Sequence, residues 1–135
     1  MILETNKDKG RVGLSLGIAY FGTNGYTVSL PLNDTQWYDL IIEKNDKIET
    51  VQCKCTTTEN GIVELSSKGG TKGTKYDSIL NHPLDWLFCV NKDGLMWLIP
   101  VEDIRKSGNV KGISLRTEPN KNHQGFETYK YLITL

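Results

Sequence analysis

The fold is decided by the stretch from Tyr38 to Thr56, YDLIIEKNDKIETVQCKCT. Apolar and polar residues alternate on each side of Asn45-Asp46, and this alternation is typical of two half-buried strands joined by a tight turn. Asn and Asp tolerate the positive φ that both central residues of a type I′ turn require, so we expect a two-residue hairpin loop. That loop length sets the register and predicts that Asp39 lies opposite Gln52.

The predicted register divides the hairpin into an apolar face and a polar face. The apolar face, which resembles a protein core, carries Leu40, Ile42, Val51, Cys53 and Cys55. The polar face carries Asp39, Gln52 and Lys54. Mg²⁺ prefers oxygen ligands, and a nearby ammonium stabilises charge that develops on phosphorus, so these three groups suit phosphodiester hydrolysis. An ordinary solvent-facing strand explains the same residues equally well, and the residues alone leave both interpretations open.

Length and composition indicate one soluble globular domain over residues 1–135. The hydrophobic fraction of 38% and the charged fraction of 24% are ordinary for such a domain. The chain has 16 basic and 16 acidic residues, a balance that weighs against strong non-specific binding of nucleic acid. No apolar run is long enough to span a bilayer, and no signal-like segment opens the chain, so we expect a cytoplasmic protein without membrane partners.

The three cysteines are an odd number, which argues against a disulfide framework. Cys53 and Cys55 alternate along one expected strand, and Cys89 lies in the apolar run DWLFCV. The two histidines, His82 and His123, lack the spacing of zinc ligands. We therefore interpret the cysteines as small buried hydrophobic residues.

Outside the hairpin, the sequence predicts one long helix and several further strands. Apolar residues recur at helical spacing over 8–23, and Asn24-Gly25 supplies residues at which a helix ends. The further expected elements are strands at 26–32, 37–43, 48–56 and 62–65, a Gly/Ser/Lys loop at 66–75, a short helix or turn at 77–81, two strands around 91–94, a helical turn at 101–108 and a last strand at 112–116. A helix followed by mostly antiparallel strands indicates an α/β or α+β fold.

The hairpin resembles the core motif of the PD-(D/E)xK nuclease superfamily, in which an Asp opens one strand and a D/E-x-K triplet follows on the next. It is more closely similar to the group I intron-encoded homing endonucleases and their phage and bacterial relatives, in which Gln often replaces the second acid. The segments that extend the likeness over nearly the whole chain are KGRVGLSLGIAYFGTNGYTVSLPLNDTQWYDL at 9–40, DWLFCVNKDGLMWLIPVEDI at 85–104 and ISLRTEPNKNHQ at 113–124. The resemblance implies a restriction-endonuclease-like core, with an N-terminal helix and a mixed, mostly antiparallel central sheet flanked by helices.

Carried over by position, the resemblance implies a metal site and a catalytic lysine. Asp39 is the principal ligand, Gln52 takes the place of the second acid with a neutral carbonyl oxygen, and the backbone carbonyl of Cys53 is a further ligand. Lys54 is the catalytic lysine, and the expected metal is Mg²⁺, with Mn²⁺ as a substitute. Asp34 is an alternative to Asp39, but only Asp39 pairs with Gln52 in the predicted hairpin.

One position departs from the pattern of these relatives. They commonly carry a Glu in the first helix, within a Gly-Glu pair that helps to hold the metal. The matching pair here is Gly13-Leu14. One carboxylate and one neutral amide predict a loosely held metal ion.

Candidate contacts to DNA lie in two polar segments. Lys68, Lys72 and Lys75 in SSKGGTKGTK suit a phosphate backbone, although the segment also fits a solvated connector. Asn122 and Gln124 in NKNHQ suit bases or phosphates, although the segment also fits a polar turn. We interpret Trp37, Trp86 and Trp97 as core or interface residues, and LMWLIP and YKYLITL as candidate strands of a subunit interface.

Taken together, the residues and the resemblance predict a Mg²⁺-dependent endodeoxyribonuclease. Homing-type duplex cleavage and Holliday-junction resolution are alternatives within that class. A nuclease-like DNA-binding module without catalysis is an alternative outside it. Cleavage of two strands requires two active sites, so a homodimer or homotetramer is expected.

Overall fold

The computed structural model describes residues 1–69, 75–108 and 111–135. Its helices are α1 (Asn6–Thr23) and α2 (Val101–Lys106), with short 3₁₀ helices η1 (Ile79–Asn81), η2 (Lys121–His123) and η3 (Tyr129–Tyr131). Its strands are β1 (Thr27–Ser29), β2 (Leu40–Lys44), β3 (Lys47–Cys55), β4 (Ile62–Glu64), β5 (Ser66–Gly69), β6 (Lys75–Ser78), β7 (Trp86–Val90), β8 (Met96–Pro100), β9 (Gly112–Ser114) and β10 (Leu132–Ile133).

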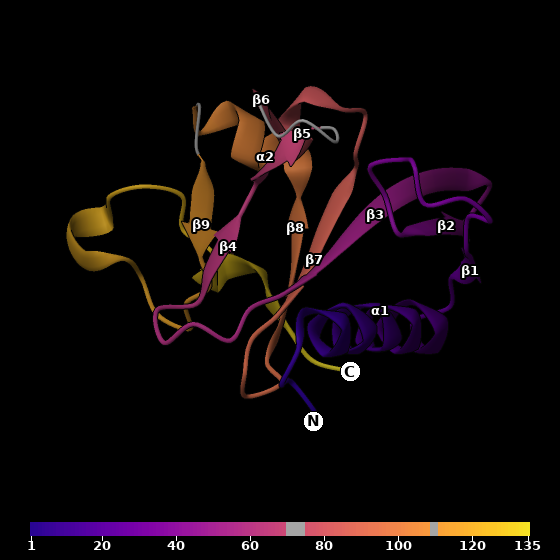
Figure 1. Cartoon of the computed structure of the whole chain (residues 1–135), viewed down its shortest axis with the longest axis horizontal. Helices are drawn as coiled ribbons and strands as arrows, with labels where there is room; N and C mark the ends of the chain where they lie inside the picture. The colour runs from indigo at the N-terminus through magenta and orange to yellow at the C-terminus, as the bar shows by residue number, and fades with distance from the viewer. Residues whose placement is uncertain (70–74, 109–110) are drawn as a thin grey trace.

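Six of these strands form the central sheet, in the order β1-β2-β3-β7-β8-β10 (Figure 1). Its neighbouring strands are antiparallel except for β3 and β7, which run parallel. The pairs β4–β9 and β5–β6 form two smaller antiparallel sheets. The predicted α+β fold with a mixed, mostly antiparallel sheet is therefore confirmed.

Helix α1 begins and ends at residues that supply its terminal hydrogen bonds. At its start, the Asp8 amide donates to Oγ1 of Thr5 at 3.1 Å, and the Thr5 amide donates to Oδ2 of Asp8 at 3.0 Å. These reciprocal bonds form a capping box. At its end, Asn24 is the C-cap and Gly25 has φ +84°, which glycine adopts without strain. The helix starts two residues before the predicted range and ends where predicted.

Two glycines let α1 lie close against β3. Gly13 and Gly17 are buried. A Cβ placed on Gly17 would lie 3.0 Å from Sγ of Cys53 and 3.3 Å from Cδ1 of Leu40, so a larger residue would force the helix away from the sheet. The hydrophobic cluster between α1 and the sheet contains Phe21, Leu40, Ile42, Val51, Phe88, Val90 and Met96, with Cys53 and Cys55 packed against it. The predicted apolar face of the hairpin is therefore confirmed.

The opposite face of the sheet is covered by the β4–β9 pair, α2 and the segment around η1. Its buried cluster contains Val63, Leu65, Ile79, Leu84, Leu87, Cys89, Trp97, Ile99, Val101, Ile104, Ile113 and Leu115. Trp97 in β8 is fully buried there. Because β8 lies inside the sheet between β7 and β10, LMWLIP is largely a core strand, and its role in a subunit interface stays a prediction.

Several predicted boundaries differ from the structure. The strand expected at 26–32 is shorter, because only Thr27–Ser29 pairs with β2. The segment 66–75 was expected to be a loop, but its first residues form β5, which pairs with β6 at 75–78. The strand near 112–116 is not the last, since β10 follows it and pairs with β8.

Candidate active site

The hairpin of β2 and β3 forms with the predicted turn and register. Asn45 and Asp46 have φ values of 53° and 61°, as a type I′ turn requires. The paired residues run from Lys44 opposite Lys47 to Leu40 opposite Val51. The register therefore brings the start of β2 beside the end of β3 that carries Gln52 and Lys54.

Asp39 lies one residue before β2, and the predicted pairing of Asp39 with Gln52 in the ladder is not formed. Its amide donates instead to the carbonyl of Val51 at 2.8 Å. Its Oδ2 accepts from the backbone amide of Cys53 at 2.8 Å and from Nε2 of Gln52 at a longer 3.5 Å. The carboxylate thus takes a backbone donor that a further strand residue would have used, and the ladder ends there.

The environment of Asp39 opposes its negative charge. Burial raises the pKa of the Asp39 carboxyl above its ordinary value. The Cys53 amide, the charge of Lys54 and the Gln52 amide each act in the opposite direction, but the pKa remains raised. A cation beside Asp39 would stabilise the ionised form that burial disfavours.

Gln52 supplies an oxygen atom that lacks a partner. Its side chain is half-buried, and its Oε1 is buried with no hydrogen-bond donor among the described residues. A buried acceptor without a donor is costly unless something else satisfies it. This oxygen and the Asp39 carboxylate are the hard oxygen donors that Mg²⁺ prefers, so the residues present fit a divalent metal ion.

The donor set is nevertheless poor in negative charge. Within residues 1–69, 75–108 and 111–135, no group of three His, Cys, Asp or Glu side chains is placed to hold a metal. A metal here would rely on Asp39, on Oε1 of Gln52 and on the backbone carbonyl of Cys53. We therefore expect weak binding of the ion without DNA.

Lys54 lies on the same face of β3 as Gln52, opposite Cys89 in the parallel register with β7. Its side chain is half-buried. Burial raises the pKa of the Cys89 thiol, and the nearby charge of Lys54 offsets part of that rise. The same charge acts on Asp39, so the predicted carboxylate, amide and ammonium are brought together.

The three cysteines are free thiols. Burial raises the pKa of Cys53, of Cys55 and of Cys89. A thiol with a raised pKa is a poor nucleophile and a poor metal ligand at neutral pH. Their side chains therefore act here as packing groups, as the sequence predicts.

Leu14 and Asp34 lie close to the candidate centre. Both line a cavity of about 280 Å³ that Asp39 and Tyr38 also line. Leu14 therefore places an apolar side chain near Asp39, where relatives were expected to carry a Glu. Asp34 is exposed, whereas Asp39 makes the contacts to Cys53 and Gln52 described above.

The predicted DNA contacts lie on other elements. Lys68 and Lys75 are in β5 and β6, and Lys72 lies outside the described residues. Asn122, in η2, and Gln124 are exposed on the segment at the far left of Figure 1. Of the four positions that the structure describes, none belongs to the cluster around Asp39.

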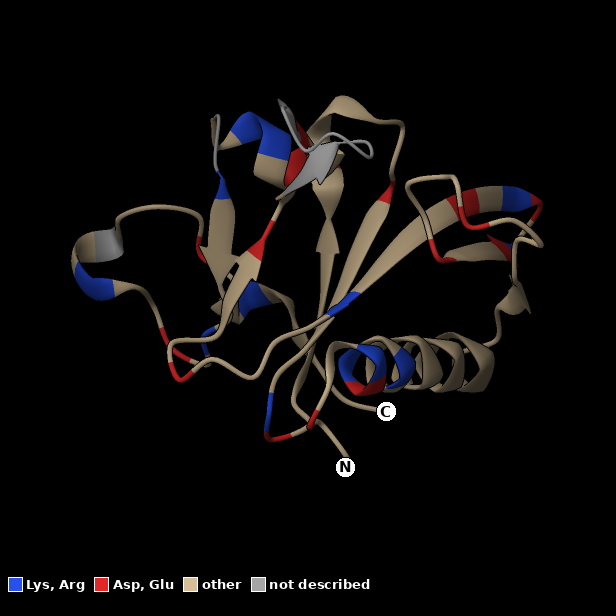
Figure 2. Cartoon of the chain, viewed as in Figure 1, with Lys and Arg blue, Asp and Glu red and all other residues tan. Residues whose placement is uncertain are grey.

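Basic residues near the Lys54 end of β3 come from α1. Figure 2 shows Lys and Arg on the first turns of α1, which carry Lys7, Lys9 and Arg11. Lys9 is near enough to Cys55 for its charge to offset part of the rise in that thiol's pKa, which burial causes. The sequence shows this basic run, but only the packing of α1 on β3 places it beside the candidate centre.

Trp37 contributes a contact that sequence analysis missed. Its ring stacks on the imidazole of His82, with centroids 4.0 Å apart and planes 17° apart. Nε2 of His82 lies 2.8 Å from Oδ2 of Asp77, and Arg105 donates to the backbone carbonyls of Leu80 and His82. Because Trp37 precedes Asp39 by two residues, this stack anchors the segment that presents the carboxylate. No local pattern signals a contact between residues so far apart in the chain.

Comparison with known protein families identifies the family of this chain. The sequence profile described as PD-(D/E)XK endonuclease matches residues 4–131. The chain belongs to the PD-(D/E)XK endonuclease family. It is thus a nuclease of the PD-(D/E)XK type, a class that generally uses divalent metals and acts on DNA.

A solved structure supports the same fold. The chain is similar to a bacterial homing endonuclease, I-Ssp6803I, with 19% sequence identity and a TM-score of 0.73. The match covers 95% of this chain and 88% of that one. No curated protein matches the chain. The predicted resemblance and the restriction-endonuclease-like fold are therefore confirmed.

Among the described residues, no helix combines the length and the apolar character that a membrane span needs.

Proposed function

We propose that the chain is a Mg²⁺-dependent endodeoxyribonuclease that hydrolyses phosphodiester bonds of DNA, with Mn²⁺ able to replace Mg²⁺. The observation that carries the proposal is the cluster at the end of β3. There a half-buried carboxylate, an amide oxygen without a donor in the described chain and an ammonium lie together in a chain of the PD-(D/E)XK family. One protein of similar fold is a homing endonuclease, and this likeness favours cleavage of duplex DNA over other nuclease reactions.

The residues would divide the work as follows. Asp39, Gln52 and the Cys53 carbonyl would hold the metal ion, which when bound would polarise a phosphate oxygen and lower the pKa of a water molecule. Lys54 orients the attacking water and stabilises the negative charge that develops on phosphorus. The Cys53 amide and Trp37 hold the Asp39 segment in position before the substrate arrives.

DNA would contact basic and polar groups outside the centre. The candidates are the three lysines of segment 66–75, together with Asn122 and Gln124.

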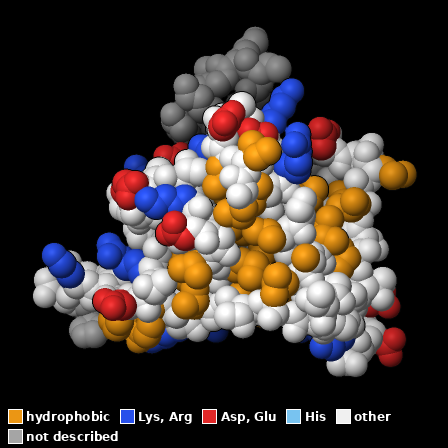
Figure 3. Space-filling model, turned by 90° about the horizontal axis from the view of Figure 1, so that it is seen from below, with side chains coloured by type: hydrophobic (Ala, Val, Ile, Leu, Met, Phe, Trp, Pro, Cys, Tyr) orange, Lys and Arg blue, Asp and Glu red, His pale blue; other side chains and the backbone are white. Residues whose placement is uncertain are grey.

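Two-strand cleavage requires two centres, so the functional unit is a homodimer or homotetramer. Figure 3 shows apolar side chains gathered on the face seen from below, which in Figure 1 carries α1 and both chain ends. Met1, Ile2 and Leu135 are among the exposed apolar residues, and such surface favours contact between copies.

The test is incubation with supercoiled plasmid and with a synthetic four-way junction, each with and without Mg²⁺. Metal-dependent nicking or linearisation of the plasmid is the expected result. Cleavage that persists in EDTA would contradict the metal dependence. Preferential cutting of junctions of arbitrary sequence would replace the homing-type function with Holliday-junction resolution.

A second candidate function is DNA binding without catalysis. The observation that favours it is that, among the described residues, no group of three acidic, His or Cys side chains is placed to hold a metal, while Leu14 lines the cavity beside Asp39. Under this alternative the chain binds DNA but does not cleave it at any Mg²⁺ or Mn²⁺ concentration. Any Lys54-dependent cutting excludes it.

A further inference from the structure

Beyond Lys54 the chain leaves the central sheet and forms a two-stranded ribbon with one face free. β4 pairs with β9, and two further bonds extend the pairing: the Leu65 amide donates to the Lys111 carbonyl, and the Leu115 amide donates to the Gly61 carbonyl, each at 2.9 Å. We call residues 61–65 and 111–115 the β4–β9 ribbon. Its inner face is buried in the core through Val63, Leu65, Ile113 and Leu115.

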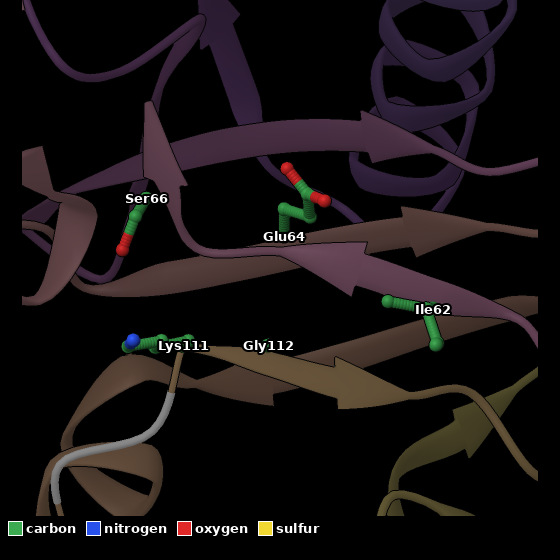
Figure 4. Close-up of a pocket in the computed structure, with 5 residues that line it drawn as sticks. All are labelled: Ile62, Glu64, Ser66, Lys111 and Gly112. Atoms are coloured by element: carbon green, nitrogen blue, oxygen red, sulfur yellow. The ribbon is translucent and has the colours of Figure 1, made fainter. Parts of the chain in front are cut away.

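The outer face of the ribbon lines a hollow of about 410 Å³ (Figure 4). The residues around it are Ile62, Glu64, Ser66, Lys111 and Gly112. Figure 4 shows Glu64 between Ile62 and Ser66, with Lys111 across from Ser66. Gly112 adds no side chain to the hollow, and a Cβ there would lie only 3.0 Å from the Val63 carbonyl oxygen, so this position favours glycine.

The chemistry of this face matches the edges of DNA bases. Within the described parts of the chain, no hydrogen bond or ion pair engages the exposed carboxylate of Glu64. A phosphate would repel this carboxylate, whereas the amino group of cytosine in the major groove donates a hydrogen bond to it. Ile62, which is 41% exposed, suits a thymine methyl, and Lys111 suits guanine or a phosphate. A two-stranded ribbon also has the width that the major groove admits.

The ribbon is tied firmly to the strand that carries Lys54. Thr56 is buried, and its hydroxyl donates to the Ile62 carbonyl at 2.8 Å. The Ile62 amide donates to Oγ1 of Thr58 at 2.9 Å. Gly61 has φ +64°, and a Cβ there would lie 2.8 Å from the Leu115 carbonyl oxygen, so the turn depends on glycine. These contacts set a fixed offset between the candidate catalytic centre and the outer face of the ribbon.

We propose that the outer face of the β4–β9 ribbon reads base edges in the major groove of duplex DNA. Glu64 is a specificity-determining residue that accepts a hydrogen bond from a cytosine amino group. The inference rests on the proposed function for its choice of DNA as the ligand. It assigns to Glu64 a role in recognition that is separate from hydrolysis.

The test is a binding selection from a random-sequence library of duplex DNA. The Lys54→Ala chain is the parent, so that bound DNA stays intact, and it is compared with the same chain carrying Glu64→Gln. Glu43→Gln is the matched control, because it removes the same charge from an exposed residue of β2 outside the ribbon. Thermal melting of each variant establishes that it is folded.

We expect DNA selected by the parent to share a cytosine at one position. Glu64→Gln should lower that preference by about tenfold, and Glu43→Gln should leave it unchanged. Identical sequence profiles with and without Glu64 would overturn the inference, and so would failure of the parent to retain any duplex.

Cleavage of the selected duplexes by the wild-type chain in Mg²⁺ separates this inference from the proposed function. If the duplexes are cut and the selected sequences do not depend on Glu64, the proposed nuclease activity stands and the proposed role of the ribbon is excluded. If the selected sequences depend on Glu64 but the duplexes are not cut, the proposed role of the ribbon stands and the proposed nuclease activity is excluded.

Discussion

The two faces of β3 differ in how completely their groups are satisfied. Cys53 and Cys55 turn towards α1, where buried glycines bring the helix into close contact. Gln52 and Lys54 turn the other way, and there Oε1 of Gln52 is buried without a donor in the described chain. One face is closed by packing, whereas the other holds polar groups that a ligand would satisfy. A single strand thus serves stability on one side and a candidate chemistry on the other.

The largest effect should come from removing the ammonium on the polar face. Lys54→Ala should lower the rate of plasmid cleavage by a factor of about 10²–10⁴, since the groups that assist proton transfer and charge stabilisation contribute on that scale. Lys47→Ala is the matched control, because Lys47 is an exposed residue at the start of the same strand. Cleavage by Lys54→Ala at the wild-type rate would exclude the assigned role.

On the apolar face, overpacking should produce the largest change in stability. Gly17→Val should lower the free energy of unfolding by about 1–3 kcal/mol, because the new side chain would meet Cys53, Leu40 and Phe88. Gly10→Ala should raise it by about 0.5–1 kcal/mol, because Gly10 lies in the helix with nothing within 4 Å of a new Cβ. Urea unfolding measures both changes. Equal destabilisation by the two variants would show that close approach does not decide the packing of α1.

A third change tests whether Gln52 faces a metal. Gln52→Glu should tighten Mg²⁺ or Mn²⁺ binding by about tenfold, because a second carboxylate adds charge to the ligand set. Isothermal titration without DNA measures the affinity, and Gln124→Glu, on an exposed segment, is the control. Unchanged affinity would point to Asp34 as the ligand in place of the Asp39 and Gln52 pair.

The smallest effect should be on the stability of the metal-free chain. Burial raises the pKa of Asp39, so the folded chain favours the protonated carboxyl. The protonated carboxyl therefore stabilises the fold at low pH, and this stabilisation is lost as the pH rises through the raised pKa. Asp39→Asn should therefore be at least as stable as wild type at neutral pH in EDTA, and its advantage should disappear below the ordinary pKa of Asp. Denaturation midpoints across this pH range measure the difference. A loss of stability at neutral pH would show that the carboxylate is satisfied without a metal.

The parts of the fold that depend on local residues follow from the sequence. Asn45-Asp46 dictates the turn, the turn dictates the register, and alternation then separates Cys53 from Gln52 and Lys54. The family resemblance rests on the same hairpin, which explains why the candidate site was identified from sequence.

Other parts depend on contacts that no local pattern encodes. The parallel pairing of β3 with β7 joins segments separated by the β4–β6 region. The ladder stops before Asp39 because a carboxylate takes the Cys53 amide, a competition between side chain and backbone that alternation does not reveal. The pairing of β5 with β6 was not predicted, because the Gly, Ser and Lys residues of 66–75 have low strand propensity and only the pairing itself makes them strands.

The two-residue turn also affects the order in which parts of the chain fold. Asp39, Gln52 and Lys54 lie within one tight hairpin, so bringing them together requires the closure of a very short loop. The pairing of β3 with β7 closes a much longer loop, and contacts of that kind form more slowly. Since the entropy of loop closure grows only slowly with length, surface connections between β3 and β7 can be lengthened at little thermodynamic cost, whereas the core residues of that segment, such as Val63 and Leu65, cannot be replaced so freely. Sequence divergence on the exposed positions of β4, Ile62 and Glu64, can change the surface proposed to face DNA while the hairpin that carries the candidate chemistry folds as before.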